Sequence, residues 1–306
     1  MFNIFKKKKK VVLPEGYSNL IDEKGYEIFL NNCLSTLKNL GYKVVSFDEG
    51  DIVYEKENSE EAHFYLDNIL RIYLQADEVD KDAEIQNHFS KLKDQTKAYD
   101  YLYKDFDYAK QFLKVLLKAD DILPNNDDFV YQKHYPELLT FLVLDFEEQF
   151  HYVKSNEVYL WETNELELFE IAKNNIRKEE IEIKQYIFED QYDVFVLLDG
   201  YFSTSYTLLI DQELDFTVGQ LGTLVALPTK GTAFLYPIEQ DDVLDVIVTI
   251  YPTIEKFFNE DPGNITLDFY WYYNGKYEKF EKEPNDDGTI TIKNPKKLAE
   301  LLNELK

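Results

Sequence analysis

The chain has 306 residues, of which 44% are hydrophobic and 16% aromatic, and this composition excludes an intrinsically disordered polypeptide. Acidic residues outnumber basic ones by 59 to 33, which gives a formal net charge of −26. A charge of this size opposes binding to nucleic-acid phosphates and to anionic membranes, and it favours a basic protein partner.

Residue types that carry nucleic-acid recognition and thiolate chemistry are scarce. Arg71 and Arg177 are the only arginines, so the side chain that binds phosphates and guanines in a bidentate way is almost missing. Cys33 is the only cysteine, so we expect neither an intrachain disulfide nor a thiolate metal cage. No apolar run is long enough to span a membrane. We therefore expect a cytoplasmic protein with a disordered basic terminus over residues 1–12 and no nucleic-acid or membrane partner.

The first part of the chain predicts a helix, a strand meander and further helices. Apolar residues recur at helical spacing from Tyr26 to Leu40, and Gly41 is typical of the residue that ends a helix. Between residues 81 and 118 apolar residues keep mostly to three- and four-residue steps, which predicts one long helix or two. The other expected elements are strands at 42–47, 51–56 and 62–65, a helix at 68–74, and a helix break at 105–107.

The stretch 124–128 is dense in turn-forming residues and is the expected boundary between two lobes, at 15–122 and 130–306. In the second lobe, Asn274–Gly275 predicts a hairpin because its turn needs two residues with positive φ. Expected strands lie at 138–146, 150–161, 181–188, 194–198, 223–227, 232–237, 267–273 and 276–280, and expected helices at 165–176, 206–215, 242–259 and 295–305. This order predicts an α+β fold with mixed or antiparallel sheets, helices packed on one face, and two lobes.

Three short stretches of the second half resemble one family. They are a helix ending at Glu170–Arg177, a strand running into a turn at Val196–Tyr201, and the strand Leu224–Pro228 followed by Phe234–Leu235. Together they resemble the YtpQ-like bacterial family, an uncharacterised domain of unknown function, and the order of elements extends the likeness over most of residues 26–282. The chain departs from the family at Phe202–Ser205, where the family usually has an acidic residue, a small residue and arginine. The resemblance implies no activity, because none is established for the family.

The turn Asp199–Gly200–Tyr201 is the candidate ligand-binding site. It follows a strongly apolar strand, and α/β proteins often bind ligands beyond the end of such a strand. In the alternative interpretation, Asp199 caps the next helix or closes a turn, and Gly200 adopts a positive φ. A second candidate is an exposed aromatic pair, Tyr270 and Tyr272, on one face of the strand 269–273, which would form an interaction surface.

No motif for a metal, a cofactor or a nucleophile emerges. Glu148 and His151 have the spacing of half a di-iron motif, but the chain holds no second copy of it. Gly219 and Gly222 lack the residues of a phosphate-binding loop. The leading hypothesis is therefore a non-catalytic binding or interaction protein, of an immunity or regulatory type, whose acidic surface meets a basic protein partner. The alternatives are a small-ligand enzyme or hydrolase that uses carboxylates near Asp199, and a purely structural domain.

Overall fold

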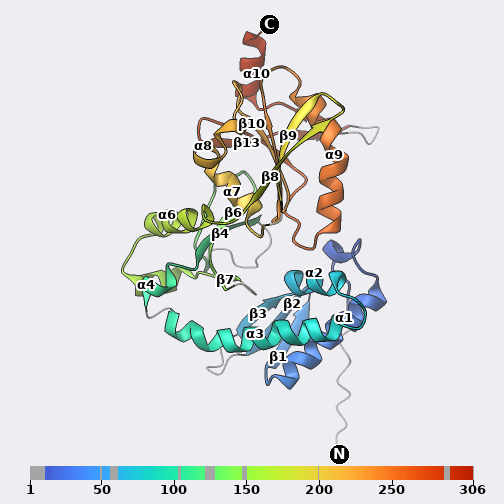
Figure 1. Ribbon diagram of the computed structural model, residues 1–306, viewed down its shortest axis with the longest axis vertical. Coiled ribbons are helices and arrows are strands. Elements are labelled where there is room, and N and C mark those ends of the chain that lie inside the picture. The colour runs from blue at the N-terminus through green and yellow to red at the C-terminus, as the bar shows by residue number, and fades with distance from the viewer. Residues whose placement is uncertain are drawn as a thin grey trace, which may run out of the picture. The chain divides into compact units, whose positions relative to one another are not determined.

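The computed structural model of the protein describes residues 11–48, 50–55, 61–102, 105–120, 128–146, 150–198, 200–285 and 290–305. It confirms the α+β class, with several antiparallel sheets. The chain divides into two compact units, Met1–Thr96 and Lys97–Lys306, so that residues 97–119 belong to the second unit (Figure 1). Among the described residues, none of the helices combines the length and the apolar character that crossing a bilayer requires. Residues 1–10 of the basic terminus and residues 124–127 lie outside the described residues.

The first unit packs helices on a three-stranded antiparallel sheet of order β1-β2-β3. Its elements are η1 (Glu15–Tyr17), α1 (Glu23–Asn39), β1 (Lys43–Asp48), β2 (Asp51–Glu55), β3 (Glu61–Tyr65), α2 (Asp67–Gln75) and the first part of α3 (Lys81–Leu102). The carboxylate of Asp22 caps α1 by accepting a hydrogen bond of 2.7 Å from the amide of Gly25. Gly41 ends the helix with a φ of 92°, as its position in the sequence predicts. Phe29, Leu37 and Phe89 are fully buried in the core of this unit.

The long helical pattern between residues 81 and 118 breaks slightly before the predicted 105–107, and the helix predicted for its last part is wrong. α3 ends at Leu102 and the short α4 spans Phe106–Ala109, whereas Leu113–Ala119 forms the strand β4. β4 pairs with β6 (Leu138–Asp145) along its whole length, and both strands are buried on both faces. Lys114 and Lys118 are four residues apart and would share one face in a helix and in a strand alike, so the pattern does not distinguish the two and the pairing partner decides the outcome.

The second unit contains two main sheets. β4 and β6 form a four-stranded sheet with β5 (Tyr131–Gln132) and β7 (Phe150–Tyr152). A six-stranded antiparallel sheet has the order β13-β12-β10-β11-β9-β8, and β14 and β15 form a separate hairpin. The bounds are β8 (Glu182–Phe188), β9 (Tyr192–Leu198), β10 (Thr223–Thr229), β11 (Thr232–Pro237), β12 (Phe269–Tyr273), β13 (Lys276–Lys279), β14 (Glu281–Pro284) and β15 (Ile290–Lys293). Asn274 and Gly275 have φ values of 48° and 76°, which confirms the predicted hairpin.

Both faces of the central strands of the six-stranded sheet are covered. One face packs against α9 (Val243–Glu260) and α10 (Lys296–Glu304), through Ile247 and Leu298 among others (Figure 1). The other face shares a second core with the four-stranded sheet and with α6 (Glu165–Ile176). Side chains on a strand alternate between its faces, so consecutive residues of each central strand enter the two cores in turn.

Two further segments differ from the prediction. The strand expected at residues 150–161 ends at Tyr152, and the helical turns α5 (Ser155–Val158) and η3 (Tyr159–Trp161) follow. The helix expected at 206–215 is a series of short segments: α7 (Ser203–Tyr206), η4 (Thr207–Leu209), α8 (Ile210–Glu213) and η5 (Asp215–Thr217). The hydroxyl of Thr207 donates a hydrogen bond to the carbonyl of Thr204 at 2.5 Å, and such side-chain bonds compete with a regular helix.

Candidate functional site

The predicted ligand site lies in the short connection between β9 and α7. Asp199 lies outside the described residues, so its proposed roles stay predictions. Gly200 is half-buried, and it does not adopt the positive φ of the alternative interpretation. The hydroxyl of Ser203 lies 3.3 Å from both the amide and the carbonyl oxygen of Gly200. A Cβ atom on Gly200 would come within 2.6 Å of the Ile181 side chain, so close packing explains this glycine.

Aromatic rings and a lysine surround this connection. The ammonium group of Lys230 lies 4.9 Å from the ring centre of Tyr201 and 5.8 Å from that of Phe150. Lys230 is only 3% exposed, because its stem packs among these rings while its charge faces their π electrons. Lys114 lies in the same way 4.9 Å from the ring of Phe202. Tyr201 itself is exposed, so its side chain reaches solvent at the predicted site.

The predicted aromatic interaction surface is wrong. Tyr270 and Tyr272 are 0% and 4% exposed, because the second face of β12 is covered as completely as the first. Both rings contact other tyrosines: Tyr270 packs edge-on against Tyr135, and Tyr272 lies against Tyr277. The hydroxyls of Tyr135 and Tyr277 lie 2.6 Å from the side chain and the carbonyl of Thr207, which fastens η4 to this core. The two tyrosines therefore stabilise the fold and offer no surface for recognition.

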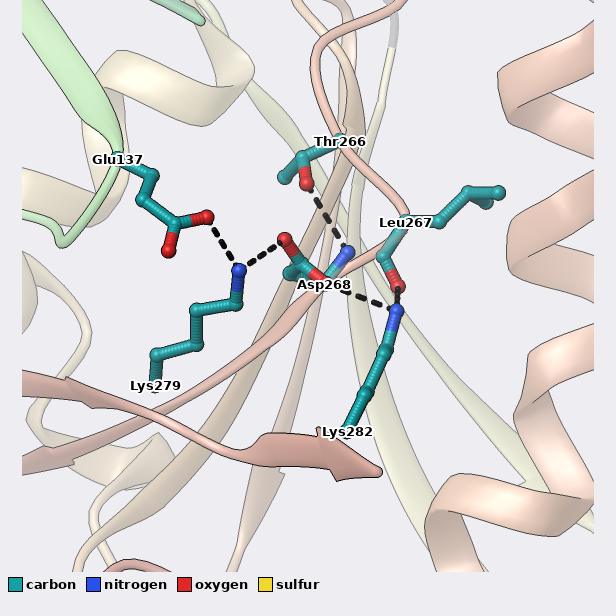
Figure 2. Close-up of polar contacts among 6 residues, drawn as sticks. All are labelled: Glu137, Thr266, Leu267, Asp268, Lys279 and Lys282. Atoms are coloured by element: carbon teal, nitrogen blue, oxygen red, sulfur yellow. Dashed lines mark hydrogen bonds and ion pairs between the residues drawn. The ribbon is translucent and has the colours of Figure 1, made fainter. Parts of the chain in front are cut away.

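The most connected group of charges on the second unit is an ion-pair network at one end of the six-stranded sheet. Figure 2 shows the carboxylate of Asp268 between two lysines, with its oxygens 2.7 Å from Lys279 Nζ and 2.8 Å from Lys282 Nζ. Lys279 also pairs with Glu137, and Lys282 donates a hydrogen bond of 3.0 Å to the carbonyl of Leu267. Two carboxylates thus balance two ammonium groups, and the network joins β13 and β14 to the loop before β12.

Electrostatics identify this network as structural. Burial by itself would raise the pKa of Asp268, but hydrogen bonds from Lys279 and Lys282 and their charges outweigh it and hold the pKa below its ordinary value. The same partners raise the pKa of Lys279 against the opposing effect of burial. Asp268 and Lys279 are thereby held in their charged forms at neutral pH, and the formal charges of the network sum to zero. Such a network fixes strands in place and leaves no group poised to accept or donate a proton.

Among the described residues, histidine, cysteine and carboxylate side chains form no cluster suited to a metal ion. Within the described ranges, no group of three or more His, Cys, Asp or Glu could hold a metal ion. Glu148 of the half di-iron spacing lies outside those ranges. Burial, reinforced by the charge of Lys173, lowers the pKa of His134 to about 4, so this imidazole is neutral at physiological pH. Cys33 is fully buried, which raises the pKa of its thiol far above the ordinary range.

The feature that the sequence did not reveal is the edge of the larger sheet at β8, which pairs on one side only within the described part of the chain. β8 comes last in the strand order, pairs with β9 without a bulge over seven residues, and is exposed along nearly all of its length. Ile183 and Ile187 lie on one face of β8, directly opposite Leu197 and Asp193 of β9. Next to them Phe195 contacts Phe216, with 5.2 Å between the ring centres. We call Ile183, Ile187, Phe195 and Phe216 the edge patch.

Carboxylates border the edge patch. Residues 178–195 contain six acidic residues against two lysines, and one of these lysines, Lys184, forms an ion pair of 2.9 Å with Glu182. Four of these six, together with Asp215 beside Phe216, are exposed, and none of the five forms an ion pair with a lysine or arginine in the described part of the chain. We call these five the acidic rim: Glu180, Glu189, Asp190, Asp193 and Asp215. The edge patch thus lies beside negative charge that has no described cationic partner.

The prediction of a strand at 181–188 was correct, but its place at a free edge was not visible in the sequence. β8 pairs with its hairpin neighbour β9, and β9 pairs on its other side with β11, which comes later in the chain, so the edge position of β8 depends on this non-local pairing. The excess of acids over lysines across residues 178–195 was the one local signal that could have drawn attention to it.

Comparison with protein-family models, with curated proteins and with solved structures finds no match to this chain.

Proposed function

We propose that this protein is a cytoplasmic, non-catalytic binding protein whose second unit takes a basic protein partner at the edge patch and its acidic rim. The observation that carries the proposal is the combination of exposed apolar side chains with exposed carboxylates that lack a described cationic partner. Ile187 is 65% exposed and Phe216 is 50% exposed, although large apolar side chains are usually buried. Solvent exposure of this kind, bordered by charge, is typical of protein interaction sites.

The net charge of the chain also supports a basic partner. With a net charge of −26, the long-range field attracts cationic partners and repels nucleic acids and other acidic proteins. We also propose that the chain is related to the YtpQ-like family. This relation would make it a bacterial protein, but it would not identify a partner. The alternative of carboxylate chemistry around Asp199 also stays a prediction.

The experiment is capture of partners on the immobilised full-length chain at low salt, followed by identification and purification of the captured protein. Its dissociation constant is then measured by titration calorimetry at two ionic strengths. A basic partner whose affinity falls with salt supports the proposal, because screening weakens attraction between opposite charges. The proposal is refuted if nothing is captured at low salt, if the partner is acidic, or if salt leaves the affinity unchanged.

Two pairs of substitutions with equal change in charge locate the contact. Asp193→Asn with Asp215→Asn removes two charges from the acidic rim, and Glu23→Gln with Glu27→Gln removes two exposed charges from α1. Exposed charge pairs contribute roughly 0.5–1 kcal/mol each, so the rim variant should bind about tenfold more weakly. The α1 variant should show only the small general effect of the changed net charge. Equal effects in the two variants would remove the rim from the proposal.

A further inference from the structure

Two edges close the six-stranded sheet, and they differ in how well they are protected. β13 has four residues, carries exposed Lys276 and Glu278, and contributes Lys279 to the ion-pair network. Short, charged edge strands are the usual protection against pairing with another chain. β8 has seven residues and contains no proline, and besides the ion pair of Glu182 with Lys184 it exposes Ile183, Tyr186 and Ile187. In an antiparallel pair alternate residues direct their N–H and C=O groups away from the neighbouring strand, so β8 presents a row of such groups outward.

The turn that connects β8 to β9 adds a second, independent observation. Glu189 and Asp190 both have positive φ values, of 50° and 54°. Asn and Gly are the residues that favour this conformation in a hairpin, and a glutamate there is strained. Strained backbone positions gather at functional sites, because function and not stability then determines the residue. The strain here holds two carboxylates of the acidic rim at the end of the open edge.

We propose that β8 binds an extended, lysine-rich segment of the partner protein, which adds to the sheet as a seventh strand. This inference rests on the proposed function and specifies the partner's chemistry. Main-chain hydrogen bonds to β8 would supply affinity, and alternate side chains of the segment would read the two faces of the sheet. Apolar side chains would cover Ile183 and Ile187 on the face of the edge patch. Lysines at the end of the segment would meet the carboxylates of Glu189 and Asp190 in the turn.

The charges on the second unit favour this occupant over a second copy of the same chain. A second copy would bring an identical acidic rim and another net charge of −26 against the first. Like charges held close together oppose such pairing, whereas a cationic segment is attracted by them.

The test uses two synthetic peptides of equal charge on the full-length chain at low salt. One alternates lysine with valine, and the other alternates lysine with proline, which cannot donate a backbone hydrogen bond to a strand. Fluorescence anisotropy gives the affinities, and amide hydrogen exchange reports protection of residues 182–187. We expect the lysine–valine peptide to bind roughly tenfold or more tightly than the lysine–proline peptide and to slow exchange along β8.

A matched pair of variants places the peptide on the edge. Ile187→Lys puts a charge on the edge patch, whereas Val248→Lys makes the same kind of change on α9, where Val248 is similarly exposed. Ile187→Lys should weaken binding of the lysine–valine peptide about tenfold, and Val248→Lys should leave it within about twofold. A Glu189→Asn and Asp190→Gly double variant should raise the urea midpoint of unfolding while it weakens binding roughly threefold, because strain and charge are removed together.

The outcomes separate this inference from the function on which it rests. If both peptides bind equally well, or if the two lysine variants behave alike, strand addition at β8 is wrong while binding of a basic partner stands. If neither peptide binds at low salt, the acidic surface does not take basic partners and both proposals fail. If sedimentation shows a dimer of the free chain that Ile187→Lys dissociates, a second copy occupies the edge and the lysine-rich segment is refuted. Unchanged binding in the turn variant would remove the role of the two carboxylates.

Discussion

Substitution of Asp268 by asparagine should destabilise the second unit by about 2–3 kcal/mol. The change keeps the shape of the side chain but removes the charge that Lys279 and Lys282 share. Breaking a buried ion pair typically costs about 3–5 kcal/mol, because the remaining charge stays out of water. Here each lysine is about a quarter exposed, and Lys279 keeps Glu137 as a partner, so water and that carboxylate reduce the cost.

Urea unfolding followed by tryptophan fluorescence measures this effect in the right part of the molecule. Both tryptophans, Trp161 and Trp271, lie in the second unit, so their emission reports its unfolding alone. Glu137→Gln is the matched control within the same network; its carboxylate is mostly exposed, and its loss should cost less than about 1 kcal/mol. A loss below about 0.5 kcal/mol for Asp268→Asn, or equal losses in the two variants, would refute the structural role of the network.

The pH dependence of the same variant provides a further check. The pKa of Asp268 is lowered in the folded protein, so its stabilising contribution is present above the unfolded pKa near 3.8 and disappears as pH falls through the folded value. The difference in stability between the wild type and Asp268→Asn should therefore be constant near neutral pH and shrink in acid. A difference that grows as pH falls would contradict the ionised state assigned to this carboxylate.

Three further predictions concern other positions. The pKa of His134 falls to about 4 on folding, so the wild type should lose about 2 kcal/mol of stability as the pH falls from 6.5 to 4. In acid titrations followed by fluorescence, His134→Asn should not show this loss. Gly222→Ala should lower the free energy of unfolding in urea by more than about 2 kcal/mol, because φ at Gly222 is 91° and a Cβ would lie 2.2 Å from the carbonyl oxygen of Tyr272. Gly16→Ala is the control: a Cβ there meets no neighbour, so the free energy of unfolding should not change. Cys33 should react with a thiol reagent only when the first unit unfolds, as reaction rates across a urea series would show.

Each of these has a clear contrary result. An acid-dependent loss that persists in His134→Asn would assign it to other groups. Equal stability of the two glycine variants would contradict the close backbone approach at Gly222. Rapid labelling of Cys33 in the absence of urea would show that the core of the first unit opens more readily than its packing indicates.

The sequence by itself determined the properties that local chemistry controls. Charge, the scarcity of arginine and the single cysteine follow from composition and limit the classes of partner. The helix end at Gly41 and the turn at Asn274–Gly275 were predictable, because each depends on the conformational preference of one or two residues.

Only the tertiary structure decided which apolar segments are covered and which are free. Leu113–Ala119 became a strand because β6 was available to pair with it, and its apolar run favours neither period. Tyr270 and Tyr272 are buried because a second core covers their face, which no feature of their own strand indicates. β8 is an open edge because the sheet ends there. Such pairings join distant parts of the chain, and so the candidate site emerged from the fold and not from a motif.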